Sequence, residues 1–481
     1  MSTSPHSTSP SAGSPLVPQP PGQTRPRGRG RLLAAVVVVL FAIAGLGGYA
    51  LTYPERMPDA VGEYVAGLTG ANPHPVQLVL PPSAPLSAVA QLGQQIFYDT
   101  SLSASGKQSC ASCHSPQHSY GPPNDLAVQL GGPHLDQAGY RPPPSLAYLY
   151  RQAVFSIGPD AADAEAPPDF AALASAAKGT QRADKVAGLA PAAPAMVPQG
   201  GLFWDGRADT LQKQAIGPLL DPNEMANASL DDVAAKLART PYAKTFQQLF
   251  GARVLNDPKL FAAEAMFAVG RYEFEEPSFH AFTSKYDYWL QGKARLTQTE
   301  LRGLHLFNDS KKANCAGCHL SAPTADHLPP LFTDTQYEAL GVPRNLTLAH
   351  NRDPKAYDIG LCGPIRKDLA TQTQYCSMFL TPTLRNSAAR HIYFHNGVYH
   401  DMKQVMDFYN LRNTNPEKIY PRDASGKVMV FNDVPKEYQA NIDYADAPFD
   451  VKPTDKPAMT DQDIKDIIAF IGTLNDGYHP D

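Results

Sequence analysis

This chain of 481 residues has little net charge, few cysteines and few strand-like patterns. The formal net charge is only −5, which gives no sign of nucleic-acid binding. Few segments have the patterns typical of strands, so the sequence predicts little β-structure. Because the chain holds just six cysteines, any regular spacing among them is informative.

Proline and glycine are plentiful instead, with 46 and 35 residues. We therefore expect long irregular connections between helices. The length allows several domains with a sizeable core. The hydrophobic content of 43% is ordinary for a globular protein.

Four of the six cysteines form two copies of the pattern C-x-x-C-H, the attachment sequence for c-type haem. Each cysteine of a pair can form a thioether with one vinyl group of a porphyrin, and the histidine that follows can bind the iron. The two copies consist of Cys110, Cys113 and His114, and of Cys315, Cys318 and His319. We predict two covalently bound haem c groups. A zinc site shared by the two cysteine pairs is the alternative.

The N-terminus has the composition of a targeting device. Residues 1–31 are rich in proline, serine and glycine, which predicts a disordered cytoplasmic tail. Arginines at its end precede an uncharged stretch, residues 32–53, that is long enough to cross a bilayer. We expect an inner-membrane anchor there, a linker over residues 54–83, and a periplasmic body, because the arginines should stay cytoplasmic. A cleaved signal peptide is the alternative.

Two cysteines, Cys362 and Cys376, remain after the haem motifs. In an exported protein, two spare cysteines indicate a disulfide, which would fix an otherwise loose segment between residues 320 and 380. Two free thiols are the alternative.

Part of the chain repeats itself. The run Gly93–Asp99 precedes the first haem motif as Gly303–Asp309 precedes the second, and the motifs begin 205 residues apart. We predict a mainly α fold with long irregular loops and two cytochrome c-like haem domains that face each other. The first would span residues 84–295, and the second residues 296–481.

Helix signals agree with this fold. Residues 229–239 and 258–275 have helical patterns, and capping boxes begin further helices at Thr297 and Thr460. In the last helix, four isoleucines recur at helical spacing and should pack inward: Ile464, Ile467, Ile468 and Ile471. Residues 150–200 are rich in alanine and proline, and we expect an inserted loop with at most one short helix near residues 170–177.

Ordered motifs between residues 84 and 474 resemble the family of bacterial di-haem cytochrome c peroxidases and MauG. Besides the haem sites, the matching segments are Leu92–Phe97, Phe203–Ala208, Gln214–Pro218, Glu224–Met225, Pro382–Asn386 and Tyr393–Gly397. The resemblance implies a periplasmic enzyme that reduces hydrogen peroxide at the first haem and takes electrons through the second.

The resemblance also implies roles for residues near the first haem. Gln214 and Glu224 match the family's two polar residues on the peroxide side, where a carboxylate would move a proton between the peroxide oxygens. Burial would raise the pKa of Glu224 towards that task, although an ordinary loop carboxylate is the alternative. Trp204 matches the tryptophan between the haems, an electron relay, with a core tryptophan as the alternative. We assign Trp289 to the core.

The sequence departs from the peroxidases at the second haem. Their far-side ligand is a methionine sixteen residues after the aromatic residue that opens the Tyr-Phe-His-x-Gly motif, and the same count from Tyr393 reaches Tyr409. MauG also has a tyrosine there, and a phenolate favours the oxidised states of iron. Met402 and Met406 are the alternative ligands.

A second departure concerns the first haem. Many of the peroxidases have a histidine about sixteen residues after the haem motif, which blocks the peroxide side before activation. The matching place here is near Leu130, and His118 and His134 are out of register. We therefore predict an open, five-coordinate first haem.

A third departure concerns calcium. The family holds an inter-domain calcium ion with an Asn that follows an Arg, whereas Pro142 follows Arg141 here and offers no side-chain oxygen. The family's calcium site also uses backbone carbonyl groups just before the Tyr-Phe-His segment. At that place this chain has Arg390, whose guanidinium could replace the charge of the ion. The sequence does not favour calcium, which stays an open alternative.

Three functions remain open from the sequence. The first is MauG-like high-valent chemistry on a protein or small reductant, favoured by Tyr409 and by the missing blocking histidine. The second is detoxification of peroxide with a c-type cytochrome or cupredoxin as electron donor, favoured by Gln214 and Glu224. The third is a di-haem electron carrier without a substrate site, which requires both irons to be six-coordinate.

Overall fold

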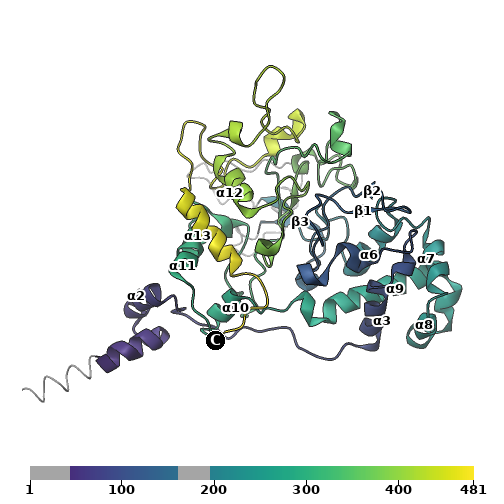
Figure 1. Ribbon diagram of the computed structural model, residues 1–481, viewed down its shortest axis with the longest axis horizontal. Coiled ribbons are helices and arrows are strands. Elements are labelled where there is room, and N and C mark those ends of the chain that lie inside the picture. Colours follow the sequence, from purple (N-terminus) through teal and green to yellow (C-terminus); the bar gives the residue numbers. More distant parts are fainter. Residues whose placement is uncertain (1–43, 161–194, 481) are drawn as a thin grey trace, which may run out of the picture.

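A computed structural model describes residues 44–160 and 195–480 of the chain (Figure 1). Within these ranges the protein is mainly helical, with three antiparallel sheets of two short strands each. The helices that build the body are α3 (Ala88–Phe97), α6 (Leu211–Leu220), α7 (Leu230–Leu237), α8 (Ala243–Phe250), α9 (Pro258–Glu275), α10 (Lys285–Leu290), α11 (Gln298–Asn308), α12 (Met402–Leu411) and α13 (Asp461–Gly472). The strands are β1 (Leu130–Gly131), β2 (Gln137–Ala138), β3 (Ser156–Pro159), β4 (Met196–Gln199), β5 (Tyr337–Glu338) and β6 (Phe379–Leu380).

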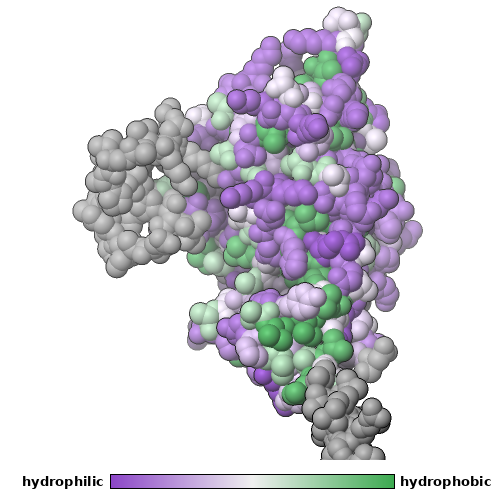
Figure 2. Space-filling view, turned by 90° about the vertical axis from the view of Figure 1, so that its left-hand side faces the viewer, coloured by the Kyte–Doolittle hydropathy of each residue, from purple (hydrophilic) through white to green (hydrophobic). Residues whose placement is uncertain are grey.

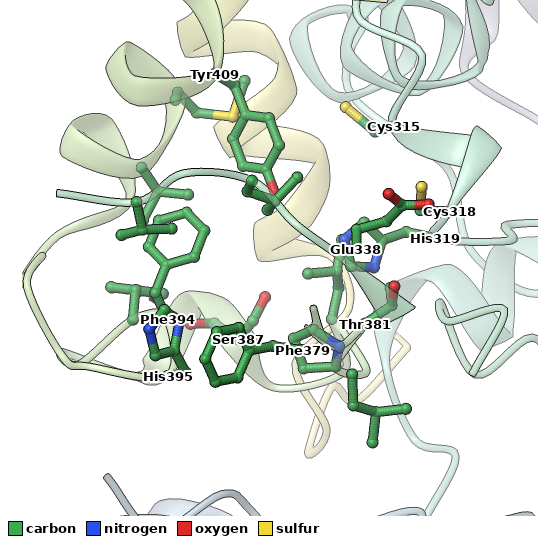
Figure 3. A pocket seen from close by; sticks show the side chains of 18 of the residues that line it. Cys315, Cys318, His319, Glu338, Phe379, Thr381, Ser387, Phe394, His395 and Tyr409 are labelled. Carbon is green, nitrogen blue, oxygen red and sulfur yellow. Dashed lines mark hydrogen bonds between the residues drawn. The ribbon is translucent and has the colours of Figure 1, made fainter. Parts of the chain in front are cut away.

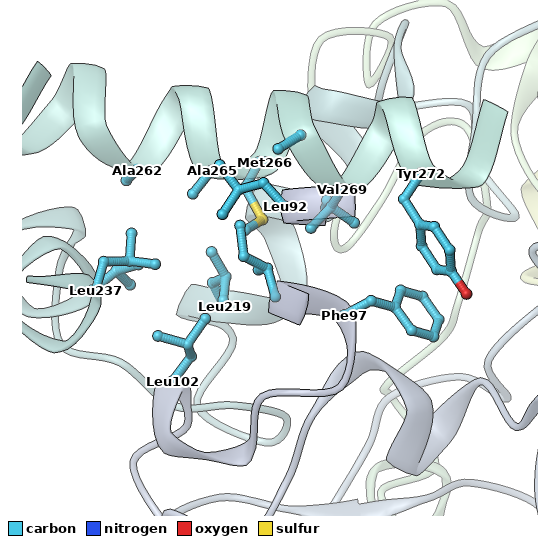
Figure 4. Packing of buried hydrophobic residues seen from close by; sticks show 14 of the residues in the cluster. Leu92, Phe97, Leu102, Leu219, Leu237, Ala262, Ala265, Met266, Val269 and Tyr272 are labelled. Carbon is cyan, nitrogen blue, oxygen red and sulfur yellow. The ribbon is translucent and has the colours of Figure 1, made fainter. Parts of the chain in front are cut away.

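The first hydrophobic core forms where α3 crosses α9 (Figure 4). The two backbones approach closely at Gly93, where a Cβ atom would stand 1.8 Å from the carbonyl oxygen of Ala268. Only glycine allows this crossing without a shift of the backbone. Leu92 and Phe97 from α3 then pack against apolar side chains of α9, such as Val269.

The second core repeats this crossing with α11 and α13. A Cβ atom on Gly303 would stand 2.0 Å from the carbonyl oxygen of Asp466. Both helices begin with the predicted capping boxes, in which the hydroxyl groups of Thr297 and Thr460 accept hydrogen bonds from the backbone three residues later. Three of the four predicted inward isoleucines are fully buried, and Ile468 is half-buried.

A second repeat leads into the helices that line the site. Phe203 and Phe394 both have a left-handed backbone, with φ of 67° and 64°, and a glycine with positive φ follows each of them three residues later. Each turn is closed by an isolated β-bridge. Helices α6 and α12 begin eight residues after the respective phenylalanine, and both span ten residues. The two halves of the chain thus share one plan, and they lie side by side in Figure 1.

A buried ion pair network joins the two halves. Arg141 donates two hydrogen bonds to the carboxylate of Asp358, at 2.7 and 2.8 Å, and a third to Asp205 at 2.7 Å. Arg366 also donates to the backbone carbonyl of Asp205. Because all these side chains are buried, each charge requires the opposite charge beside it.

The segment over residues 54–83, expected to be a linker, contains helix α2 (Asp59–Thr69) and packs on the second half of the molecule. The carbonyl oxygen of Gly70 accepts hydrogen bonds from the Leu296 backbone and from the indole of Trp289. Trp289 is a core residue, as predicted. On the outer side, α2 exposes apolar side chains such as Tyr64, and Figure 2 shows apolar residues gathered at this end of the molecule.

Other features expected at the N-terminus and in the insertion fall largely outside the described residues. These are the tail, residues 32–43 of the anchor, and the short helix near residues 170–177. In the two described ranges, no helix has the length and apolar character needed to span a bilayer. The insertion is bounded by the pairing of β3 with β4.

Cys362 and Cys376 form the expected disulfide, with their Cα atoms 5.0 Å apart.

Candidate active site

Each C-x-x-C-H motif lines its own cavity. The first cavity contains Cys110, Cys113 and His114, and the second contains Cys315, Cys318 and His319. All four cysteines are free thiols that line the cavity walls. The four thiols therefore do not converge on one point, which contradicts the alternative of a zinc site shared by both pairs.

The two histidines are held in the state that an iron ligand requires. Nδ1 of His114 lies 3.2 Å from the carbonyl oxygen of Tyr120, and Nδ1 of His319 lies 2.9 Å from that of Phe332. A carbonyl oxygen only accepts hydrogen bonds, so Nδ1 carries the proton and the lone pair of Nε2 stays free. Burial lowers the pKa of both imidazoles to about 4, so both are neutral at physiological pH.

The thiols are neutral as well. Burial raises the pKa of Cys110, Cys113 and Cys315 to about 12, and it raises the pKa of Cys318 too. A buried neutral thiol beside a cavity is consistent with a group that becomes a thioether, because that bond removes the ionisable proton.

Gln214 and Glu224 lie in the first cavity, where the sequence analysis expected them. Gln214 is buried on α6, and Glu224 follows in the loop after that helix. Burial, with a smaller effect of the Asp221 carboxylate, raises the pKa of Glu224 to about 7, while Arg207 opposes the shift. A carboxyl group that titrates near neutral pH can both take up and release a proton. Its catalytic role stays a prediction.

No second histidine lines the first cavity within the ranges that the structure describes. Leu130 forms part of its wall, whereas His118 and His134 lie outside it. Pro218, inside helix α6, also lines this cavity. Proline has no side-chain atom that could bind a metal ion, so Pro218 would not act as a ligand to an iron bound in this cavity.

Tyr409 lies in the second cavity on α12, together with Met402 and Met406 (Figure 3). In Figure 3 the phenol oxygen of Tyr409 points across the cavity towards His319, and it makes no hydrogen bond to any described residue. The ring stacks on Phe449, with the ring centres 5.4 Å apart. Burial raises the pKa of the Tyr409 phenol. A bound metal ion would be needed to hold it as a phenolate.

Trp204 separates the two cavities and lines both of them. Its indole nitrogen donates to the carbonyl oxygen of Pro142 at 3.0 Å, and its own carbonyl oxygen accepts from Leu380. The segment of Pro142, Pro143 and Pro144 forms the rest of the shared wall. One hydrogen bond thus fixes the indole and another fixes the Trp204 backbone, and the relay role stays a prediction.

Sequence reasoning missed several residues of the site. Glu273 on α9 is buried in the first cavity, its Oε2 atom has no hydrogen-bond partner, and burial raises its pKa to about 8. Glu273 lies in a helical stretch of mostly apolar residues, and nothing in that stretch indicates a functional carboxyl group. Arg141 was considered only for calcium, yet its guanidinium binds Asp205 and Asp358. Within the described residues, no cluster of three or more His, Cys, Asp or Glu side chains is arranged to hold a metal ion.

Comparison with known proteins decides the family. A profile of the family described as di-haem cytochrome c peroxidase matches residues 87–295. The methylamine utilization protein MauG of Paracoccus denitrificans (strain Pd 1222) is 30% identical over 399 residues, which cover 81% of this chain and 89% of that protein. This chain belongs to the di-haem cytochrome c peroxidase family.

Other members of the family align over similar lengths. Cytochrome c551 peroxidase of Nitrosomonas europaea is 27% identical over 371 residues, covering 76% of this chain and 85% of that protein. The crystal structure of the diheme peroxidase BthA from Burkholderia thailandensis E264 superposes with a TM-score of 0.68 at 33% identity, covering 85% of this chain and 94% of the other. The chain is therefore an oxidoreductase, and its family implies two haem cofactors.

The residues present fit a di-haem peroxidase. Each cavity offers two neutral thiols and one imidazole whose Nε2 is free. Both walls combine apolar side chains with polar and charged ones, such as Glu224 in the first cavity and Arg390 in the second. By the pattern of the family, His114 and His319 of this chain would hold the two irons, and the cysteine pairs would hold the porphyrins.

Proposed function

We propose that this enzyme reduces hydrogen peroxide to water in the first cavity and draws two electrons through the second. Two protons and two electrons enter, and two molecules of water leave. Covalently bound haem c would supply an iron that exchanges electrons in each of two facing domains, with peroxide binding in the first. The observation that carries this proposal is the contrast between the cavities, with Pro218 in the first where the second has Tyr409.

Glu224 is the proton carrier of the proposed reaction. As a carboxylate it accepts the proton from the oxygen of peroxide that faces the iron, and it then delivers that proton to the outer oxygen, which leaves as water. Its pKa of about 7 suits both directions of transfer. Gln214, buried on the same side of the cavity, would orient the peroxide by hydrogen bonding.

Tyr409, and the lack of a second histidine among the described residues of the first cavity, support MauG-like chemistry over ordinary peroxide detoxification. The indole of Trp204 lies in the wall that both cavities share, so it can pass an electron between them. Phenolate ligation by Tyr409 would favour oxidised iron in the second cavity and help to store an oxidising equivalent there. The final reductant would be a protein substrate or a small reductant. A c-type cytochrome or cupredoxin is the donor of the second candidate function, cytochrome c peroxidase.

We also propose a periplasmic location with residues 32–53 as an inner-membrane anchor. Three features support it: the arginines before the apolar stretch, the haem attachment motifs, and the Cys362–Cys376 disulfide, since disulfides persist in oxidising compartments. Spheroplast fractionation tests it, with haem protein expected in the membrane fraction and susceptible to external protease.

The substitution Glu224→Gln tests the proposed reaction. It keeps the size of the side chain but removes the proton carrier, so peroxide turnover should fall by about 100-fold or more. Glu264→Gln, on α9 and outside both cavities, is the matched control. Turnover by Glu224→Gln that equals the control would exclude the assigned role.

A further inference from the structure

The second cavity contains an arginine, Arg390, without a counter-charge among the described residues. Arg390 lines this cavity, and its Nε atom is buried without any hydrogen-bond partner. Its guanidinium donates one hydrogen bond within the described residues, to the carbonyl oxygen of Arg385 at 3.2 Å. No carboxylate of the described residues forms an ion pair with it. A guanidinium buried in this way is costly unless an anion joins it.

Other buried arginines of this half have partners for their donors, either carboxylates or, for Arg412, an amide oxygen and two carbonyl oxygens. The guanidinium of Arg385, five residues earlier, is fully buried and binds both carboxylate oxygens of Asp287, at 2.8 and 3.0 Å. Arg344 is paired with Asp433, and Arg141 with Asp358. Two acids of the second cavity, Asp358 and Asp433, are therefore engaged by other arginines.

A second unsatisfied donor lies beside Arg390. The hydroxyl group of Ser387 is buried and has no hydrogen-bond partner, and Ser387 also lines the second cavity. The two residues belong to one tight turn, in which the Arg390 amide donates to the Ser387 carbonyl oxygen at 3.1 Å. Figure 3 shows the Ser387 hydroxyl directed into the cavity. A guanidinium and a hydroxyl side by side are suited to a carboxylate.

We propose that Arg390 and Ser387 form the binding site for a carboxylate of the second haem, one of its propionates. The propionate would be the anion that Arg390 lacks. Its binding to Arg390 and Ser387 would also fix the rotation of the porphyrin in its plane. The guanidinium would also add positive charge to the cavity that holds the second haem, which would make the ferric state less stable and raise the reduction potential. The inference rests on the placement of the second haem proposed above.

Arg390→Met and Ser387→Ala in the full-length holoenzyme test this site. In Arg390→Met the reduction potential of the second haem should fall and become dependent on pH, because the carboxylate loses its counter-charge. Arg390→Lys should restore part of the potential. Ser387→Ala removes only a hydrogen bond, so it should shift the propionate bending bands in the resonance Raman spectrum with a smaller change in potential. Arg302→Met, on an exposed arginine paired with Asp466, is the control.

Three outcomes would overturn the inference. The first is unchanged Raman bands and potential in both cavity variants. The second is a potential of the wild-type second haem that changes with acetate or chloride concentration, since Arg390 would then bind a free anion. The third is a protein with haem only on the first motif, which would also refute the placement of the second haem. Haem staining after denaturation, with Cys315→Ala as the reference for that loss, separates this third outcome from the first two.

Discussion

Pro218 and Tyr409 occupy the same position in the two halves of the chain. Each lies fifteen residues after a phenylalanine with a left-handed backbone, Phe203 or Phe394, and each lies on a helix that begins eight residues after that phenylalanine. Each side chain lines the cavity of its own half. One half thus has a phenol oxygen where the other has a proline ring without any donor. Under the proposed function, this difference would make the second centre closed and leave the first one open.

Tyr409→Met should convert the second centre towards that of a cytochrome c peroxidase. A thioether stabilises ferrous iron more than a phenolate does, so the reduction potential of the second haem should rise. Redox titration followed by optical spectroscopy measures this. Tyr399→Phe is the control, because this tyrosine contacts the same aromatic cluster but lies outside the cavity. If Met402 or Met406 were the ligand, the reduction potential of the second haem in Tyr409→Met would equal that of the wild type.

The rate of peroxide turnover should depend on the ionisation of Glu224. The group must be a carboxylate to accept the first proton, and its pKa is about 7. The rate constant for reaction with peroxide should therefore rise with pH through about 7 and level off above it. Stopped-flow mixing over this pH range gives the profile. Glu224→Asp should keep a sigmoidal profile, whereas Glu224→Gln should show a low and flat one.

Trp204→Phe should slow electron transfer between the two haems and leave the first reaction with peroxide intact. The substitution removes the indole from the shared wall but keeps an aromatic ring there. Freeze-quench EPR can follow the ferric signals of both haems separately. Trp289→Phe is the contrasting variant, since its indole binds Gly70 inside the second core. It should lose about 1–3 kcal/mol of stability with unchanged electron transfer.

Glu273 should destabilise the protein as the pH rises. Its folded pKa of about 8 lies above the value of about 4.5 expected for an unfolded chain, so the folded state binds its proton more tightly. The stabilisation of the folded state by protonated Glu273 is complete below pH 4.5. It is lost progressively up to about pH 8, at about 1.4 kcal/mol per pKa unit. Glu273→Gln should lose less stability than the wild type over this range. Denaturant unfolding at several pH values tests the difference, and parallel curves would contradict it.

Short-range patterns in the sequence predicted much of the fold. Capping boxes at Thr297 and Thr460 and the helix over residues 258–275 depend on neighbours along the chain, and they agree with the structure. The Cys362–Cys376 pair was also predictable, because no other cysteines remained. The packing of α2 against the second half was not, since its hydrogen bonds reach residues more than 200 positions away.

Some residues of the site were predicted from the sequence and others were not, again because long-range packing leaves no local pattern. The resemblance to the di-haem peroxidase family predicted that Gln214, Glu224, Trp204 and Tyr409 belong to the haem sites, and all four line the cavities. The burial of Glu273 arises from packing between distant segments, which no local pattern reports.

Peroxide added to the purified all-ferric protein, with optical and EPR spectra recorded together, tests the central claim most directly. An open first haem and a tyrosine-ligated second haem predict rapid loss of both ferric signals without prior reduction. A reaction that occurs only after one haem has been reduced would contradict the account and favour an ordinary cytochrome c peroxidase. No reaction in either state would leave only the di-haem electron carrier.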